Sequence, residues 1–479
     1  MIRPPLSSKC LLGRGTQQQQ HTVFALARRS FSIDVKQFPE KKQRHIPASG
    51  TYPRGFLAGG SHCGVKANGA PDLAMIYSEL PCTAAAVFTK NQFCAAPVQF
   101  DRALLERAAA SGTPSVRCAV INSGCANAVT GSQGMQNARR MALAADNFVA
   151  KCDGQAQPGV EPTHASLIMS TGVIGQQLPI EKIERGIASL ELGASHSDWM
   201  CASIAHMTTD TFPKLRSKEF TLPASPSSSQ DSGQTYRFAG ITKGAGMIHP
   251  NMATLLGTIC TDVSISQPLL AKALRYAVDR SFNSISIDGD TSTNDTIAVL
   301  ANGAACPGSR DGYMVDSESS PVFEAFRDEL TAFAVELASL VVRDGEGATK
   351  FITVRIKGAR TYDEGKTVAT AISTSALVKT AFYGQDANWG RILCAVGYSS
   401  IPVDTDKVSL TMIPSDRSQP MPLVVNGEPL PLDEERAKEI LALEDVAVEV
   451  DLGLGDEVFE MYTCDFSHDY VSINADYRS

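Results

Sequence analysis

The sequence lacks the features that mark metal-binding, membrane-spanning or nucleic-acid-binding proteins. Its 12 cysteines include no Cys-x-x-Cys pair and no Cys/His group at zinc spacing, so buried thiols in a reducing compartment are expected. No apolar run approaches the roughly 18 residues of a membrane-spanning helix. The net charge of −8 is not gathered into blocks, so no surface for nucleic acid or an anionic membrane is expected. These absences favour small-molecule chemistry.

Acidic residues are missing from the first 33 positions, which instead carry several cations among serines and glutamines: Arg3, Lys9, Arg14, Arg28 and Arg29. This composition is typical of a mitochondrial transit peptide, and no apolar stretch is long enough for a secretory signal. We therefore expect residues 1–33 to be a presequence and the mature chain to act in the mitochondrial matrix. The alternative is a disordered tail on a cytosolic protein.

The rest of the chain mixes strand-like and helix-like segments. β-branched runs predict strands at 116–122, 257–263, 296–301 and 352–356. Apolar residues recur every three or four positions over 322–341, and a Ser-x-Pro start at 266–268 opens a second helix. The 479 residues suffice for two or three domains, or for one large two-lobed unit. We expect an α/β or α+β fold, with the serine-rich stretches 223–234 and 316–321 as loops rather than domain boundaries.

One segment, "GAGMIHPNMATLL" at 244–256, suggests chemistry of its own. An internal threonine hydroxyl is a poor nucleophile. If the Ala253–Thr254 bond were cut, however, Thr254 would carry a free α-amine beside its hydroxyl, and one residue would supply both nucleophile and general base. The glycines and Pro250 allow a strained loop that aims the hydroxyl at the preceding carbonyl for an N-to-O acyl shift. The ordinary alternative is a threonine at the start of a strand.

A phosphate-binding loop is excluded for this segment. Lys243 precedes the glycines, whereas the phosphate-binding pattern G-x-x-x-x-G-K-[ST] places its lysine after them. That string occurs nowhere in the chain.

The segment "TKGAGMIHPNMATLL" is very similar to the one that defines the ornithine acetyltransferase family of arginine biosynthesis. Further blocks resemble the same family in order along the chain: "NSGCANAVTG" at 122–131, "MSTGVIGQ" at 169–176, "MTTDTFPK" at 207–214, "SISIDGDTSTNDT" at 284–296, "RDGEGATK" at 343–350, "GQDANWGRI" at 384–392 and the final "SHDYVSINADYRS". The resemblance therefore extends over nearly all of the chain after the presequence.

This resemblance implies an enzyme that moves an acetyl group from N-acetylornithine to glutamate through an acetylated Thr254. It implies an α/β sandwich of two interwoven chains made by self-cleavage: an α chain of residues 34–253 and a β chain of residues 254–479. Two of each would form a heterotetramer. No metal or organic cofactor is expected, and acetyl-CoA is a possible second acetyl donor.

The resemblance also implies roles for individual residues. Thr171 and Gly172 match the oxyanion hole, and Ala253 with Thr254 matches the cleavage site. Substrate-binding positions of the family fall on Thr208, Lys243, Thr254, Glu346, Asn474 and Ser479. A slip of one position would replace Thr208 by Thr209. Lys243 suits a substrate carboxylate and Glu346 an ornithine ammonium; taken alone, each would be an ordinary surface residue.

Two other clusters invite a role. Asp288, Asp290, Asn294 and Asp295 contain oxygen ligands but lack the spacing of a calcium loop, so they are interpreted as turn-forming and helix-capping groups rather than as a metal site. His249 is interpreted as shaping its loop rather than as a general base. Cys125 departs from the family, in which many members carry asparagine, and a thiol does not replace the hydrogen bonds of an amide.

Two rival functions remain open. An amidohydrolase or aminopeptidase with an N-terminal threonine would give the acyl group to water instead of glutamate. An amino-acid-binding protein would remain a single uncut chain.

Overall fold

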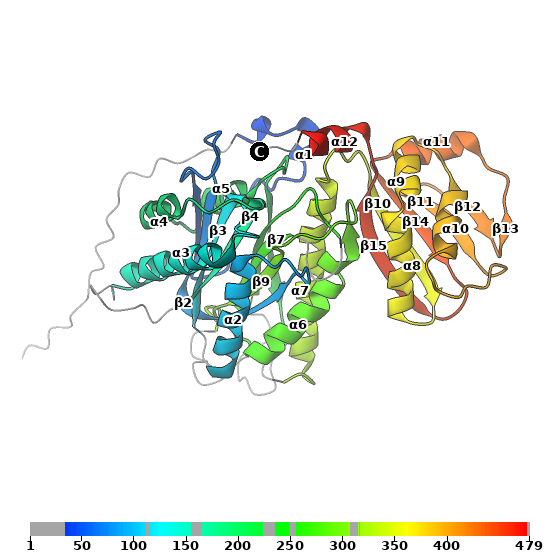
Figure 1. Cartoon of the computed structure of the whole chain (residues 1–479). Helices are drawn as coiled ribbons and strands as arrows, with labels where there is room; N and C mark the ends of the chain where they lie inside the picture. Colours follow the sequence, from blue (N-terminus) through cyan, green and yellow to red (C-terminus); the bar gives the residue numbers. More distant parts are fainter. Residues whose placement is uncertain are drawn as a thin grey trace, which may run out of the picture.

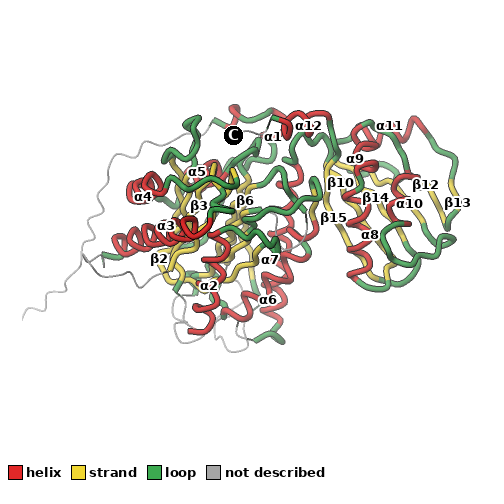
Figure 2. Tube along the Cα trace, in the orientation of Figure 1, coloured by secondary structure: helices red, strands yellow, loops and turns green. Residues whose placement is uncertain are grey.

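The computed structural model describes residues 34–111, 115–154, 165–223, 235–249, 255–306, 315 and 317–476. The predicted presequence lies outside these residues. Two β-sheets form two lobes, with the second lobe at the right of Figure 1. Figure 2 shows helices packed beside the strands of both lobes. Within the described part of the chain, no helix is both long and apolar enough to cross a membrane.

The first sheet contains eight strands: β1 (Phe56–Ser61), β2 (Leu73–Phe88), β3 (Val116–Cys125), β4 (Ala165–Val173), β5 (Lys214–Thr221), β6 (Thr235–Lys243), β7 (Leu256–Thr261) and β9 (Thr296–Ala301). Their order is β4-β3-β2-β9-β7-β6-β5, with β1 paired to β2 outside this path. Strands β7 and β9, which follow the central loop in sequence, therefore lie between β2 and β6, which precede it. The two halves of the sequence share one sheet, as expected.

The second sheet has the order β13-β12-β11-β14-β10-β15-β8. Its strands are β8 (Ile285–Ser286), β10 (Phe351–Ala359), β11 (Ser409–Pro414), β12 (Met421–Val425), β13 (Glu428–Pro429), β14 (Asp445–Asp451) and β15 (Glu457–Cys464). Helices α8 (Tyr362–Thr374), α9 (Ala376–Tyr383), α10 (Trp389–Gly397) and α11 (Glu434–Ala442) share its hydrophobic core. This lobe supplies no strand to the first sheet.

Helices cover both faces of the first sheet because residues alternate along its central strands. In β9, Ile297 and Val299 face the core made with α6 (Gln267–Asp279) and α7 (Pro321–Arg343), whereas Ala298 and Leu300 face the opposite core. On that opposite side lies α5 (His196–His206), whereas α3 (Gly131–Cys152), α4 (Ile180–Ser189) and the start of α2 (Ala96–Ser111) pack on the same face as α6 and α7. Short elements complete the fold: α1 (Glu40–Gln43), α12 (His468–Ala475) and 3-10 turns at Val35–Gln37 and Phe282–Ser284.

Helix α7 joins the lobes. The hydroxyl of Ser320 caps its start by accepting from the Val322 N–H, and Pro321 occupies the first turn, where a missing N–H costs nothing. Its apolar stripe packs on β5 and β6 of the first sheet and on β8 and β15 of the second. Phe333 from α7 stacks on Phe238 of β6 with ring centroids 5.3 Å apart. The predicted α/β class, both predicted helices and all four predicted strands are confirmed.

Truncation of Phe238 should destabilise this junction. Its ring is fully buried between Phe333 and Phe220, the latter at 4.4 Å between centroids. Phe238→Ala is expected to lower the free energy of unfolding by about 3–5 kcal/mol because it leaves a cavity. Leu377→Ala, at a side chain that is 60% exposed, is the control and should change it by less than about 0.5 kcal/mol. Denaturant unfolding measures both; equal effects would contradict this packing.

Candidate active site

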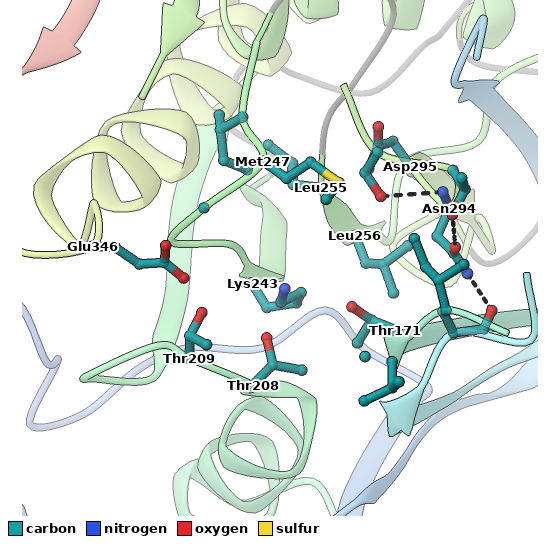
Figure 3. Close-up of a pocket in the computed structure, with 18 of the residues that line it drawn as sticks. Thr171, Thr208, Thr209, Lys243, Met247, Leu255, Leu256, Asn294, Asp295 and Glu346 are labelled. Atoms are coloured by element: carbon teal, nitrogen blue, oxygen red, sulfur yellow. Dashed lines mark hydrogen bonds between the residues drawn. The ribbon is translucent and has the colours of Figure 1, made fainter. Parts of the chain in front are cut away.

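A cavity of about 300 Å³ opens where the ends of β4 and β6 meet the beginnings of β7 and β9. Its volume suits a ligand of amino-acid size. Figure 3 shows Lys243 near the middle, Glu346 on one side, and Asn294 with Asp295 on the other. The lining residues are Ala126, Thr171, Gly172, Val173, Ile174, Thr208, Thr209, Lys243, Gly246, Met247, Ile248, Leu255, Leu256, Ser292, Thr293, Asn294, Asp295, Glu346 and Asn474.

The parallel strands β3 and β4 place the predicted oxyanion-hole residues. Near the end of their pairing, Thr171 and Gly172 lie beside Ser123 and Gly124. Gly172 has a φ of +126°, and a Cβ added there would lie 2.3 Å from the carbonyl carbon of Gly124. Only glycine fits that position. A threonine hydroxyl and a glycine N–H at one cavity wall are suitable donors for a developing oxyanion.

Asn294 ties the β9 side of the cavity to β3 and β4. Its side-chain amide donates to the carbonyl oxygens of Ala126 at 2.5 Å and Ser170 at 2.7 Å. The Ser170 hydroxyl donates to Asn122 Oδ1 at 2.6 Å, and the Asn122 amide donates to the carbonyl of Cys125 at 2.9 Å. The Cys125 thiol itself donates to a backbone carbonyl at 3.3 Å. Because these groups are buried, the network fixes the wall that carries Thr171.

A buried ion bridge fixes the floor of the cavity. The ammonium of Lys214 lies 2.5 Å from Asp210 Oδ1 and 2.6 Å from Asp344 Oδ2, and all three side chains are almost fully buried. Asp210 also accepts the N–H groups of Thr208 at 2.9 Å and Gly244 at 2.8 Å. One carboxylate thus holds both a predicted substrate-binding threonine and the residue that follows β6.

The two carboxyl groups of this bridge have pKa values shifted in opposite directions. Burial raises the pKa of Asp210, but Lys214, Lys243 and the Gly244 N–H outweigh it and hold that pKa below its usual range. Burial raises the pKa of Asp344 above its usual value despite the opposing charge of Lys214. For Lys214, burial lowers the pKa, yet the two carboxylates raise it overall. Lys214 and Asp210 therefore form the firmly charged pair.

Lys243 provides the one cationic side chain among the described residues that line the cavity. Burial lowers the pKa of its ammonium, while the carboxyl groups of Asp210, Asp295 and Glu346 act in the opposite direction. Asp295 is also buried, and desolvation raises its pKa well above the usual value, which favours the neutral acid. A neutral Asp295 leaves the Lys243 ammonium available to a ligand carboxylate.

Glu346 faces Lys243 across the cavity, on the turn after α7. Its N–H donates to the Ala245 carbonyl at 2.8 Å, and its Oε2 accepts from the Asn474 amide at 2.8 Å. Gly246 makes room for the carboxylate, since a Cβ there would lie 2.5 Å from Glu346 Oε2. A buried carboxylate opposite a lysine suits a ligand with an ammonium at one end and a carboxylate at the other.

The structure brings together six of the predicted site residues: Thr171, Gly172, Thr208, Lys243, Glu346 and Asn474. Thr209 also lines the cavity, beside Thr208. Ala253, Thr254 and Ser479 lie outside the described residues. The residue after Thr254, Leu255, lines the cavity, and its carbonyl accepts from the Thr296 N–H at 2.9 Å.

Asp288 and His249 make contacts at the start of the central loop. The Asp288 carboxylate accepts the N–H groups of Met247 at 2.5 Å and Ile248 at 2.9 Å. His249 Nδ1 lies 3.2 Å from the Ser286 hydroxyl, and His249 is not among the cavity-lining residues. Asp288 is therefore a backbone acceptor that holds the loop beside the cavity.

Comparisons with known proteins identify the family of this chain. The family model described as the ArgJ family matches residues 57–479. The chain belongs to the ArgJ family. A relative from Podospora anserina named arginine biosynthesis bifunctional protein ArgJ, mitochondrial, is 50% identical over 98% of this chain and 99% of its own. Its namesake from Chaetomium globosum is 53% identical over 92% and 91%.

Two solved structures of the family were also matched. ArgJ from Bacillus halodurans is 37% identical, with a TM-score of 0.42, over 46% of this chain and 97% of its own. Ornithine acetyltransferase from Mycobacterium tuberculosis, in complex with ornithine, is 31% identical, with a TM-score of 0.35, over 43% and 98%. This ArgJ chain is thus a bifunctional transferase of arginine biosynthesis and a mitochondrial protein, and those predictions are confirmed.

Sequence reasoning missed the residues that hold the site. Asp210, Lys214 and Asp344 all lie inside blocks quoted for the resemblance, but nothing in their spacing shows that Lys214 is buried between the other two. His206 is a further case: it is fully buried, and neither ring nitrogen has a hydrogen-bond partner among the described residues. A histidine or lysine inside an otherwise apolar segment is the one signal that could have found them.

Loss of the buried lysine should unfold the site. Lys214→Met leaves two buried carboxylates without their cation and is expected to lower the free energy of unfolding by about 3–5 kcal/mol. Lys218→Met, on the same strand, removes a half-exposed pair with Glu329 and should cost less than about 1 kcal/mol. Denaturant unfolding of the two variants tests this; similar losses would show that the bridge does not stabilise the fold.

His206 should make stability depend on acidity. Burial, followed by the charge of Lys243, lowers the pKa of His206 from 6.5 to about 3. Between pH 3 and 6.5 the unfolded chain binds a proton at His206 that the folded protein does not. The free energy of unfolding is therefore highest above pH 6.5 and falls as pH drops from 6.5 towards 3. The expected slope is about 1.4 kcal/mol per pH unit. In denaturant unfolding at a series of pH values, His206→Leu should remove this one-proton contribution to the pH dependence. His468→Leu, at an exposed histidine, should leave it unchanged.

Proposed function

We propose that this enzyme transfers an acetyl group from N-acetylornithine to glutamate, giving ornithine and N-acetylglutamate. The observation that carries the proposal is the convergence in one cavity of two oxyanion donors, a lysine and a glutamate, beside the residue that follows Thr254. The relatives' name supplies the pathway, and the ornithine complex of the mycobacterial enzyme supports the class of substrate.

The reaction starts from a cut chain. The Thr254 hydroxyl attacks the Ala253 carbonyl, and water opens the resulting ester to leave an α chain of 34–253 and a β chain that begins at Thr254. The freed α-amine, with an ordinary pKa near 8, then takes the hydroxyl proton of the same residue. The self-cleaved halves remain associated because β7 and β9 lie within the sheet of the first half.

Acetyl transfer then proceeds in two steps. The Thr254 oxygen attacks the acetamide carbonyl, Thr171 and Gly172 stabilise the oxyanion, and the α-amine returns the proton to the departing ornithine amine. Glutamate enters next, and its amine takes the acetyl group from Thr254. Because ornithine leaves before glutamate reacts, the kinetics follow a double displacement.

Substrate binding divides among the remaining residues. Lys243 binds the α-carboxylate shared by both amino acids, Glu346 with Asn474 binds the δ-ammonium of ornithine, and Thr208 and Ser479 complete the substrate-binding set. The second activity in the relatives' name fits acetyl-CoA as an alternative acetyl donor to glutamate. Two α and two β chains form the working heterotetramer. No step requires a metal or an organic cofactor.

The intact mass of the denatured protein tests the cleavage. Wild type should give two fragments, the second beginning at Thr254, whereas Thr254→Ala should give one uncut chain without activity. Thr254→Ser should cleave and retain part of the activity because it keeps a hydroxyl. Thr258→Val, a buried position on the same strand, is the control and should still give two fragments.

Glutamate-dependent turnover separates the transferase from its rivals. Release of acetate at the same rate without glutamate would favour a hydrolase. A single uncut chain in both wild type and Thr254→Ala would favour an amino-acid-binding protein.

A further inference from the structure

A second cavity, of about 560 Å³, lies at the end of β2, beside the start of α2 and the middle of α6. Figure 1 shows α2 and α6 on the same side of the first sheet. Three of its lining residues are cations, Lys90, Arg102 and Arg275, and none of its lining residues is acidic. Nothing in the proposed reaction uses this cavity.

The three cations have no acidic partner in the described part of the chain. Arg102 stacks over the Phe88 ring at 5.6 Å and donates to the Thr89 carbonyl at 3.3 Å, but neither it, Lys90 nor Arg275 forms a salt bridge with any described residue. All three come from different parts of the chain and are exposed. Three uncompensated positive charges around a concavity, in a protein of net charge −8, form a local anion-binding field.

The second cavity shares a wall with the active site. The Thr89 N–H donates to the Asp295 carbonyl at 2.9 Å, and its hydroxyl donates to the Ser292 carbonyl at 2.9 Å. The Asn91 amide donates to the Thr291 carbonyl at 3.2 Å. Ser292 and Asp295 line the active-site cavity, whereas Thr89 and Asn91 line the second one. Segment 291–295 therefore separates the two by the thickness of one chain.

The active-site cavity is too small, and carries too few cations, to hold the phosphate groups of coenzyme A as well as an acylated amino acid. About 300 Å³ holds an acylated amino acid, and its single lysine is already required by the substrate carboxylate. Coenzyme A adds a pantetheine arm and a nucleotide with three phosphate groups, which need cations outside that space. Phe93, 68% exposed and between two residues that line the second cavity, offers a face on which an adenine ring can stack.

We propose that the second cavity binds the phosphate-bearing nucleotide of an acyl-CoA donor, while the pantetheine arm crosses the rim at Thr291 and Ser292 into the active site. This inference rests on the proposed function, specifically on its acetyl-CoA reaction. It assigns the two donors to different surfaces: N-acetylornithine uses only the active-site cavity, and the thioester uses both.

The double variant Arg102→Gln/Arg275→Gln tests the assignment. Its KM for acetyl-CoA should rise at least tenfold, with kcat/KM for acetyl transfer from N-acetylornithine unchanged within twofold, because only the first donor carries phosphates. Unchanged transfer from N-acetylornithine also shows that the variant is folded. Lys272→Gln, which removes one cation a turn earlier on α6 and outside the second cavity, is the control and should leave both constants as in wild type.

Direct binding gives an independent readout. Adenosine 3′,5′-bisphosphate, a fragment of coenzyme A, should bind wild type in calorimetry, compete with acetyl-CoA and leave transfer from N-acetylornithine unaffected. Binding should weaken at least tenfold in the double variant and severalfold in Phe93→Ala. An unchanged KM for acetyl-CoA in the double variant, or inhibition of both donors by the fragment, would overturn the proposal.

The two proposals fail in different ways. If wild type does not acetylate glutamate from acetyl-CoA, the acetyl-CoA part of the proposed function is wrong. Fragment binding that is lost in the double variant would then identify only a nucleotide site. If wild type uses acetyl-CoA but the double variant uses it equally well, the proposed function stands and the second cavity is not its phosphate site.

Discussion

The bridge of Lys214 between Asp210 and Asp344 is the constraint on which the site depends. It joins a strand of the first half of the chain to the end of α7 in the second half, inside a core that excludes water. Charged groups in that environment are stable only when each is paired and hydrogen-bonded. Asp210 also accepts the N–H groups of Thr208 and Gly244, so the requirement of charge balance also fixes the backbone at the cavity floor.

The interleaved sheet explains how the two halves act as one enzyme. Strands β7 and β9 lie between β2 and β6, and cavity-lining residues lie at the start of β7 and directly before β9. A cut in the central loop would leave every one of these strand pairs intact. A chain end can therefore be created at the cavity without loss of the sheet, which is the structural condition for a nucleophile that is also an N-terminal residue.

Local patterns were sufficient to predict the elements and many of the site residues. The apolar stripe of α7 and the β-branched runs of β3 and β9 are properties of neighbouring residues, and they were predicted. Thr171, Lys243 and Glu346 were predicted from a family resemblance and converge in one cavity. The bridge of Asp210, Lys214 and Asp344 was not, because Asp344 lies 130 positions from Lys214 in sequence and their pairing depends on tertiary packing. The three cations of the second cavity were not predicted either, because they come together only through tertiary packing.

Acetylation of the enzyme by N-acetylornithine in the absence of glutamate tests most directly the claim that Thr254 carries the acetyl group. Wild type is incubated with N-acetylornithine without glutamate and denatured, and the masses of its fragments are measured by mass spectrometry. The account predicts one acetyl group on the fragment that begins at Thr254, and its disappearance once glutamate is added. Turnover without any acetylated fragment, with kinetics that require both substrates to be bound at once, would contradict it.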